Sequence, residues 1–394
     1  MFKWLRRSIQ FLHADETQVF DADDVVKNWL KSQKPALIDN KLLRPIEHRF
    51  VNGTPLSTEG GQAKVFYLES EQDNTRWILK KFKQGQGLDD SYLKTVGQVL
   101  PNHPSFQSGT DRSILSSNSI DTTNGYYHND ALKRWLDGSV LTPCVVGSDW
   151  SFVADELREG DCVLDKQQRL TLCRKLSEIV RELEKNNCAH RDLSCGNVFI
   201  CLDTLDVVLI DFDGVFHPNL VVPFRTTCGS EGYIAPFVYE HGSANVRTTW
   251  CTHADRFALA LLNVEFLLLG KGSPLTFDGG MFDQDELCSR HGKQLGEIGH
   301  KLASEYPKAF SLFDAALNSN DFSCCPSPDA WIAFCDSALN EKVPSLSELE
   351  AVDTGFFDAV LQKIRAAKLP RVASVSLPDD PWACENGRLS ETTK

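Results

Sequence analysis

The residues best suited to chemistry lie in two short runs of the chain. One is His190–Asn197, with the sequence HRDLSCGN, and the other is Asp211–Gly214, with the sequence DFDG. Carboxylates and an amide at this spacing can hold a hard cation such as Mg²⁺ and accept a proton from a hydroxyl group. Phosphoryl transfer has these needs, because it depends on positioning and charge neutralisation more than on covalent chemistry.

The two runs together resemble the catalytic motifs of the protein kinase superfamily, in particular those of divergent bacterial serine/threonine kinases. The resemblance implies that Asp192 orients a substrate hydroxyl and accepts its proton, and that Asn197 and Asp211 bind Mg²⁺. ATP is then the phosphate donor. Two residues depart from the family pattern: Ser194 stands where a lysine is usual, and Asp213 stands where a glycine is usual.

A second motif, TEGGQAKV over residues 58–65, is similar to the glycine-rich phosphate loop of the family. Gly60, Gly61 and Val65 are therefore expected to contact the nucleotide. Lys80 follows at the family spacing, at the end of the strand-like run RWILK, and is expected to bind the phosphates. Lys81 is the alternative, because adjacent residues of a strand face opposite sides of a sheet.

The usual partner of this lysine is a glutamate on the next helix, and the sequence lacks it. No glutamate occurs between Glu71 and Glu156. An aspartate (Asp89 or Asp90), Gln98, or no residue at all must serve in its place. A pseudokinase that binds a nucleotide without turnover is therefore one alternative function.

Residues 153–160 resemble the strand and hinge that join the two lobes of a kinase. The resemblance implies that main-chain groups of Glu156 and Arg158 contact adenine. Residues 105–130, which are rich in Ser, Thr, Asn and Gly, have no apolar period that would bury them and are interpreted as a polar insertion.

Residues 228–236 (CGSEGYIAP) are similar to the substrate-docking loop of serine/threonine kinases, and Ser230 lies where a hydroxyl usually bonds the catalytic aspartate. Just before this loop, Thr226 and Thr227 are candidate sites of autophosphorylation, and Arg191 is placed to pair with such a phosphate. Its alternative role is hydrogen bonding within the catalytic loop.

The helical lobe carries its own family features. Asp255 resembles the buried aspartate that holds the catalytic-loop backbone, with a surface helix cap as the alternative. The family's glutamate and arginine pair is replaced at both positions, by Phe237 and Cys325. Loss of both charges together can be neutral for stability, whereas loss of one leaves a charge buried.

These motifs predict an α+β, two-lobed protein-kinase-like fold, with a β-rich N-lobe and a mainly helical C-lobe. Short amphipathic helices are expected near the N-terminus, and one more over 354–368. The expected parts are an N-terminal helical extension (1–45), the N-lobe and hinge (46–160), the C-lobe (161–340), and a C-terminal helix and tail (341–394).

Composition limits the other functions. The 394 residues carry a formal net charge of −13, which disfavours nucleic-acid backbones and anionic lipids as partners. The most apolar run, 257–269, is too short to cross a bilayer and is expected to be a buried helix. Thirteen cysteines without zinc spacing are typical of free thiols. A cytoplasmic location is expected.

The sequence therefore predicts an ATP- and Mg²⁺-dependent kinase that transfers the γ-phosphate to Ser or Thr hydroxyls of a protein substrate. A kinase of small molecules is an alternative, because Ser194 and Asp213 depart from the protein-kinase pattern. A nucleotide-binding pseudokinase scaffold is another. The protein substrate and the oligomeric state are not defined by any motif.

Overall fold

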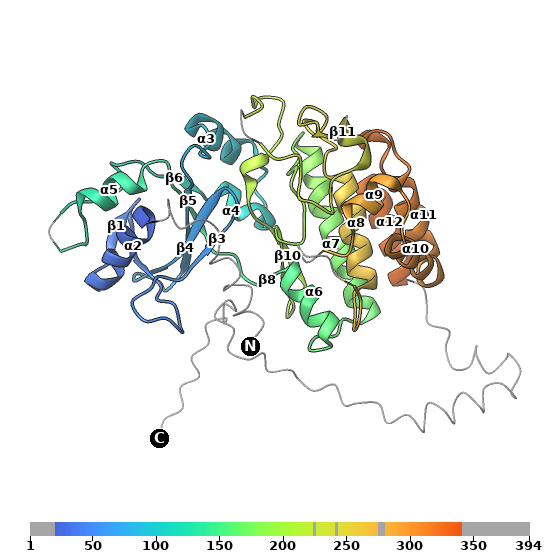
Figure 1. The fold of residues 1–394 in the computed structure, drawn as a ribbon, viewed down its shortest axis with the longest axis horizontal. Coiled ribbons are helices and arrows are strands. Elements are labelled where there is room, and N and C mark those ends of the chain that lie inside the picture. Colours follow the sequence, from blue (N-terminus) through green and yellow to red (C-terminus); the bar gives the residue numbers. More distant parts are fainter. Residues whose placement is uncertain (1–19, 124, 224–225, 241–242, 275–279, 341–394) are drawn as a thin grey trace, which may run out of the picture.

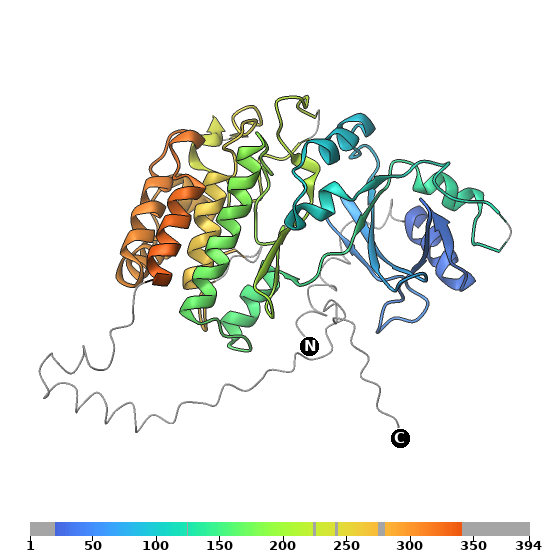
Figure 2. The same cartoon turned by 180° about the vertical axis from the view of Figure 1, so that it is seen from behind.

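The structure, a computed structural model, describes residues 20–340 apart from 124, 224–225, 241–242 and 275–279. Within this part, a sheet-rich lobe lies beside a helical lobe (Figures 1 and 2). The predicted α+β, two-lobed architecture is confirmed. The helices expected within 1–19 and over 354–368 lie outside the described residues.

In the described part of the chain, the first lobe is built on a seven-stranded antiparallel sheet with the order β1-β2-β4-β5-β7-β6, in which β3 also pairs with β4. The strands are β1 (Ala36–Ile38), β2 (Lys41–Pro45), β3 (Ser57–Glu59), β4 (Ala63–Ser70), β5 (Arg76–Phe82), β6 (Ser113–Ile114) and β7 (Val140–Pro143).

The two faces of this sheet have different roles. Phe66 and Leu68 of β4 point to one face, where they pack with Trp29 of α2 (Phe20–Ser32) and Leu132 of α5 (Asp130–Leu136). These two helices lie on the side of the sheet away from the helical lobe (Figure 1). The alternate residues of β4 face the other lobe, as the two-residue period of a strand requires.

The sheet begins earlier in the chain than the expected boundary at residue 46. Leu43 of β2 is opposite Ser70 of β4, and β1 pairs with β2. We propose that the N-lobe starts at α2, because Trp29 is fully buried in the core of the sheet. Strands as short as β1 show too few alternations to be distinguished from a loop in the sequence.

The interpretation of 105–130 as an unburied insertion is wrong. This region contributes η2 (Pro104–Phe106), α4 (Gln107–Thr110) and β6, and it follows α3 (Asp90–Val99), the helix expected near 92–100. Phe106, Leu115 and Ile120 are buried. Their spacing fits neither a helix nor a strand, so the burial of this region left no periodic pattern in the sequence.

The expected strand and hinge over 153–160 is also wrong, because these residues belong to helix α6 (Trp150–Glu159). Trp150, Val153, Ala154 and Leu157 are buried at helical spacing, and the helix ends at Gly160 in a left-handed conformation. The connection between the lobes is instead the segment from the end of β7 to β8 (Ser148–Asp149).

The helical lobe is organised around α8 (Arg256–Leu268), which is buried on every side as the apolar run predicted. Its main neighbours are α7 (Lys166–Lys185), which begins with an Asp165–Gln168 capping box, and α11 (Pro307–Leu317). The remaining elements are β9 (Val198–Cys201), β10 (Asp206–Leu209), η3 (Phe212–Gly214), η4 (Pro236–Val238), β11 (Tyr239–Glu240), β12 (Ser243–Ala244), α9 (Gln284–Ser289), α10 (Lys293–Glu305), η5 (Phe322–Cys324) and α12 (Pro328–Asn340).

Apolar groups occupy the position of the lost glutamate and arginine pair. The ring of Phe237 packs edge-on against that of Phe322, with 4.8 Å between centroids. Cys325 is buried beside them. The concerted replacement inferred from the sequence is therefore accommodated without an isolated buried charge at this position.

Two further observations concern membrane-spanning helices and the state of the cysteines. Among the described residues, no helix is both long and apolar enough to cross a bilayer. The cysteines of that part, from Cys144 to Cys335, are all free thiols, as expected.

Candidate active site

One buried carboxylate anchors the main chain of the catalytic loop. Asp255 accepts hydrogen bonds from the main-chain nitrogens of His190, at 2.6 Å, and Arg191, at 2.7 Å. Burial raises the pKa of Asp255 above its ordinary value, and the two backbone donors oppose that shift by stabilising the charged form. The anchoring role implied by the family resemblance is confirmed, and Asp255 is not a surface cap.

Arg191 joins the catalytic loop to the segment that follows Asp211. Its φ of 70° is in the left-handed region, and it is 3% exposed. Its five donor hydrogens are matched by five bonds, to the carbonyls of Thr249, Gly214 and Thr227 and the hydroxyls of Thr249 and Thr226. The second role predicted for Arg191, hydrogen bonding around the loop, is the one that its contacts fulfil.

Asp192 and Asn197 are fixed relative to each other at the open end of the loop. The Asn197 side-chain amide donates to the main-chain oxygen of Asp192 at 2.8 Å. The hydroxyl of Ser230 donates to a carboxylate oxygen of Asp192, also at 2.8 Å. The docking-loop serine therefore lies where its position in the sequence predicted, in direct contact with the candidate catalytic carboxylate.

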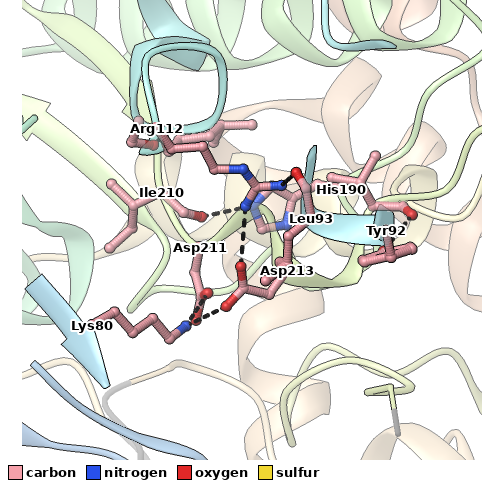
Figure 3. A network of polar contacts seen from close by, with 11 residues as sticks. Lys80, Tyr92, Leu93, Arg112, His190, Ile210, Asp211 and Asp213 are labelled. Carbon is pink, nitrogen blue, oxygen red and sulfur yellow. Dashed lines mark hydrogen bonds and ion pairs between the residues drawn. The ribbon is translucent and has the colours of Figure 1, made fainter. Parts of the chain in front are cut away.

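Lys80, and not Lys81, faces the other lobe. In the β4–β5 pairing Lys80 lies opposite Val65, on the face of the sheet that is turned toward the C-lobe. Its Nζ is 2.5 Å from a carboxylate oxygen of Asp211 and 2.6 Å from one of Asp213 (Figure 3). Lys81 points away and donates to the main-chain oxygen of Asp137.

The acidic run after β10 adopts a tight turn that directs two carboxylates to the same lysine. Asp211 has a φ of 62° and precedes the 3₁₀ turn η3. Phe212, between the two aspartates, is buried against the rings of Phe106 and His190. The left-handed backbone of Asp211 and the packed ring of Phe212 thus fix the directions of both aspartate side chains.

Arg112 completes the cluster from the region that was interpreted as an insertion. Its guanidinium lies 3.2 Å from the second carboxylate oxygen of Asp213 and donates to the main-chain oxygen of Leu93 in α3 (Figure 3). Arg112 belongs to no motif of the sequence and was not expected at the site. The apolar residues on either side of it, Phe106 and Leu115, were the available indication that the region is packed.

None of the residues proposed for the missing glutamate contacts Lys80. Asp89 is the N-cap of α3 and accepts from the main-chain nitrogens of Ser91 and Tyr92. Asp90 and Gln98 are outside the cluster around Lys80, whose carboxylate partners are Asp211 and Asp213.

The charged groups of this cluster shift one another's pKa values. Burial alone would lower the pKa of Lys80, but the nearby carboxylates of Asp211 and Asp213 raise it above its ordinary value. Burial would raise the pKa of Asp213, yet Lys80 and Arg112 hold it below the usual range. Burial and the neighbouring acids raise the pKa of Asp211. A further positive charge beside Asp211 is thus electrostatically favoured.

A cavity of about 330 Å³ lies between the lobes and brings these groups together. Val65, Ile78 and Val140 line it from the sheet, and Phe199 and Ile210 line it from the C-lobe. Lys80, Asp211 and Asp213 also line it, and the connecting segment 143–149 borders it as well. A largely apolar slot with a few charged groups can enclose a flat ring with a charged tail.

The remaining residues expected to bind the nucleotide lie elsewhere. Gly60 and Gly61 form the exposed β3–β4 turn, where the Gly60 nitrogen donates to the Ala63 oxygen, and they do not line the cavity. Glu156 and Arg158 are on α6 and do not line the cavity, so the geometry does not support the adenine contacts that the resemblance implies. Cys144 to Ser148 occupy the position that the sequence analysis gave to 153–160.

Gly147 shows why the connecting segment takes this course. Its φ is +111°, and a Cβ placed on it would collide with the main-chain oxygen of Ile200 in β9. A glycine is therefore required where the connection crosses β9.

The donor set fits a magnesium ion. Asn197 and Asp211 offer an amide oxygen and a carboxylate, both hard ligands, and the fixed Asn197 nitrogen places the amide oxygen on the opposite side of the group. Among the described residues, no cluster of three or more His, Cys, Asp and Glu forms a metal site. An ion here would complete its shell with phosphate and water oxygens.

A buried carboxyl ties the docking loop to the rest of the lobe. Glu265 of α8 accepts from the indole nitrogen of Trp150, the hydroxyl of Tyr233 and the main-chain nitrogen of Met281, at 2.7 to 3.0 Å. Burial raises the pKa of Glu265 to about 7. This network connects α6, α8 and the docking loop.

The two lobes, the anchored catalytic loop and the lysine facing an aspartate across a cavity define a protein kinase fold. No protein-family model matches the chain. It is similar to the phosphorylase b kinase gamma catalytic chain, liver/testis isoform, of Mus musculus, at 31% identity over 189 residues, which is 45% of each chain. The Bos taurus protein of that name is 31% identical over 120 residues, 30% of this chain and 28% of its own.

The chain thus resembles members of the protein kinase superfamily in both fold and sequence. It spans less than half the length of the curated relatives that it matches.

Proposed function

We propose that this protein is an ATP-dependent protein kinase that phosphorylates serine or threonine hydroxyls with the aid of Mg²⁺. The observation that carries the proposal is the ion pair of Lys80 with Asp211 in the lining of the interlobe cavity, with Asp192 close enough to Asp211 to contribute to the rise of its pKa. Similarity to a kinase catalytic chain supports phosphotransferase activity in general terms.

In the proposed reaction, Asp192 accepts the proton of the substrate hydroxyl as its oxygen bonds to the γ-phosphorus. The bond from that phosphorus to the bridging oxygen breaks, and ADP leaves with the electron pair. Lys80 binds phosphate oxygens, and Asn197 and Asp211 would hold Mg²⁺. When bound, the ion neutralises charge on the phosphates.

A protein substrate is favoured over a small molecule by the docking loop. The Gln284 side chain accepts from the main-chain nitrogens of Gly232 and Ile234 and donates to the oxygen of Ile234. Together with the Ser230–Asp192 bond, this bracing presents an ordered backbone next to the catalytic carboxylate. A peptide chain can align along such an edge.

Autophosphorylation at Thr226 or Thr227 stays a prediction from the sequence. The Arg191 guanidinium holds this segment through the carbonyl of Thr227 and the hydroxyl of Thr226, and its other donors bind Gly214 and Thr249. We therefore propose that the segment is ordered before any phosphate is attached, and that such a phosphate modulates activity without being required for it.

The test is transfer of label from ATP carrying a labelled γ-phosphate to a generic protein substrate, followed by identification of the modified residue. Lys80→Met and Asp192→Asn should each lower transfer at least a hundredfold. Lys81→Met, on the same strand but facing away, and Asp203→Asn, on the surface, are the matched controls and should retain it.

Equal labelling by wild type and Asp192→Asn refutes the proposed chemistry. Label on small hydroxyl compounds but not on protein supports the small-molecule alternative. Binding of Mg²⁺ and ATP without any transfer supports the pseudokinase.

A further inference from the structure

We propose that Asp213 is the positioning partner of Lys80, in place of the missing helix glutamate, and that Arg112 holds Asp213 in position. This inference rests on the proposed function of the same site. It assigns a role to one residue that departs from the family pattern and to another that no motif identified.

The two carboxylates on Lys80 differ in their surroundings. The side chain of Asp211 is 38% exposed, whereas that of Asp213 is 11% exposed and that of Arg112 is 3% exposed. Both carboxylates line the cavity, and Asp211 is the more open of the two to a ligand there. The difference assigns Asp211 to the metal and Asp213 to the lysine.

Arg112 uses both ends of its guanidinium. One nitrogen is 3.2 Å from Asp213, and another donates at 3.0 Å to the main-chain oxygen of Leu93 in α3. Helix α3, which would carry the glutamate in the family, thus contributes a backbone carbonyl to Arg112. The carboxylate that binds Lys80 comes instead from Asp213. The hydroxyl of Tyr92, also on α3, donates to the oxygen of Val215 and fixes the end of the same acidic turn.

The charges support this assignment. An extra buried carboxylate next to Asp211 would be costly alone, because like charges at this separation disfavour each other. Lys80 and Arg112 supply two positive charges for the two carboxylates. Removal of Arg112 would leave Asp213 buried with one partner, which is shared with Asp211.

The consequence concerns how the lysine becomes positioned. Where its partner lies on a mobile helix, movement of that helix can switch the site. Here the partner lies two residues from the metal-binding aspartate, within the turn that η3 forms. Lys80 is therefore positioned whenever this turn is formed.

The test is a double-mutant cycle between Lys80→Met and Asp213→Asn, read by kcat, by KM for ATP and by affinity for a fluorescent ADP analogue without metal. Asp213→Asn should raise KM and weaken metal-free binding by about tenfold or more, because a charge-assisted contact is lost. In the Lys80→Met background, Asp213→Asn should change KM and metal-free binding by less than about twofold more, because Asp213 acts through the lysine.

Arg112→Met should reproduce the Asp213→Asn losses, and Arg112→Lys, which keeps the charge but cannot reach both partners in the same way, should recover part of them. Asp206→Asn is the matched control, because it removes an aspartate that pairs with Lys175 at the surface at 2.9 Å. Thermal unfolding of every variant separates loss of fold from loss of position.

Independent effects of Lys80 and Asp213 in the cycle overturn the inference, as does an Asp213→Asn variant with wild-type KM and binding. Failure of the proposed function has a different signature, which is wild-type protein that transfers no phosphate. The metal-free binding cycle still decides the inference in that case. If Asp213→Asn does not fold, the Arg112→Lys and Arg112→Met pair gives the same comparison.

Discussion

Replacement of Glu265 by glutamine should change how the stability of this protein depends on pH. Glu265 is buried in α8, and its three hydrogen-bond donors, from Trp150, Tyr233 and Met281, are neutral. Its pKa is about 7 in the folded state, against an ordinary value of 4.5. The folded protein therefore binds this proton more tightly than the unfolded chain does.

The sign and size of the effect follow from linkage. A carboxyl with a raised pKa favours folding most below about pH 4.5, and this contribution is lost as the pH rises to about 7. Between pH 5.5 and pH 8, the two pKa values give a loss of about 2 kcal/mol in the free energy of unfolding. The glutamine variant does not titrate at this position and should not show the loss.

The assay is urea unfolding of wild type and Glu265→Gln at pH 5.5, 7 and 8. The difference between the two free energies of unfolding should shift by about 2 kcal/mol in favour of the variant from the lowest pH to the highest. Glu297→Gln, which removes a carboxyl that is 64% exposed on α10, is the control. Parallel curves for wild type and Glu265→Gln, within about 0.5 kcal/mol, would refute the reasoning.

Two further predictions concern the surroundings of the acidic turn. Gly109→Ala should destabilise the fold by about 1–3 kcal/mol in chemical unfolding and raise KM for ATP, because the new Cβ would lie 2.7 Å from the Phe212 ring. Gly97→Ala on α3 should neither destabilise the fold nor raise KM, because its Cβ would meet only ordinary contacts. Equal behaviour of the two variants would contradict the argument. Phosphatase-treated wild type and Thr226→Val should transfer phosphate at a rate within about threefold of untreated protein, because backbone carbonyls already accept hydrogen bonds from three of the Arg191 donors. Mass spectrometry verifies the absence of phosphate. A loss greater than about tenfold would show that the phosphate is required.

The parts of the site that could be predicted from the sequence are those in which residue type and close spacing define the chemistry. Asp192, Asn197 and Asp211 lie in two short runs, and Ser230 lies in a third. The choice of Lys80 over Lys81 followed from its family spacing after Val65, and in the structure Lys80 is the one of the two that contacts Asp211. Asp255 was expected from the resemblance of the run DRFAL, residues 255–259, to the buried anchor of the family, and it accepts hydrogen bonds from two main-chain nitrogens of the catalytic loop.

The parts that could not be predicted depend on contacts between distant segments. Residues 153–160 contain three apolar residues, Val153, Ala154 and Leu157, which are too few to separate a strand from a helix. The packing of Trp150 and Leu157 selects the helix. Arg112 pairs with Asp213 across 101 positions. A charged residue in a polar region does not reveal a buried partner, so neither periodicity nor local composition indicated this contact.

The left-handed backbone at Asp211 has a practical consequence for choosing an inactive reference protein. Alanine at this position would remove the proposed metal ligand, release one contact of Lys80 and also place a residue that disfavours a φ of 62° in the turn. Its effect would therefore combine chemistry with a local rearrangement that includes Asp213. Asparagine tolerates this conformation and keeps the side-chain shape, so Asp211→Asn isolates the loss of charge. For this chain, the more conservative substitution is the cleaner way to silence the site.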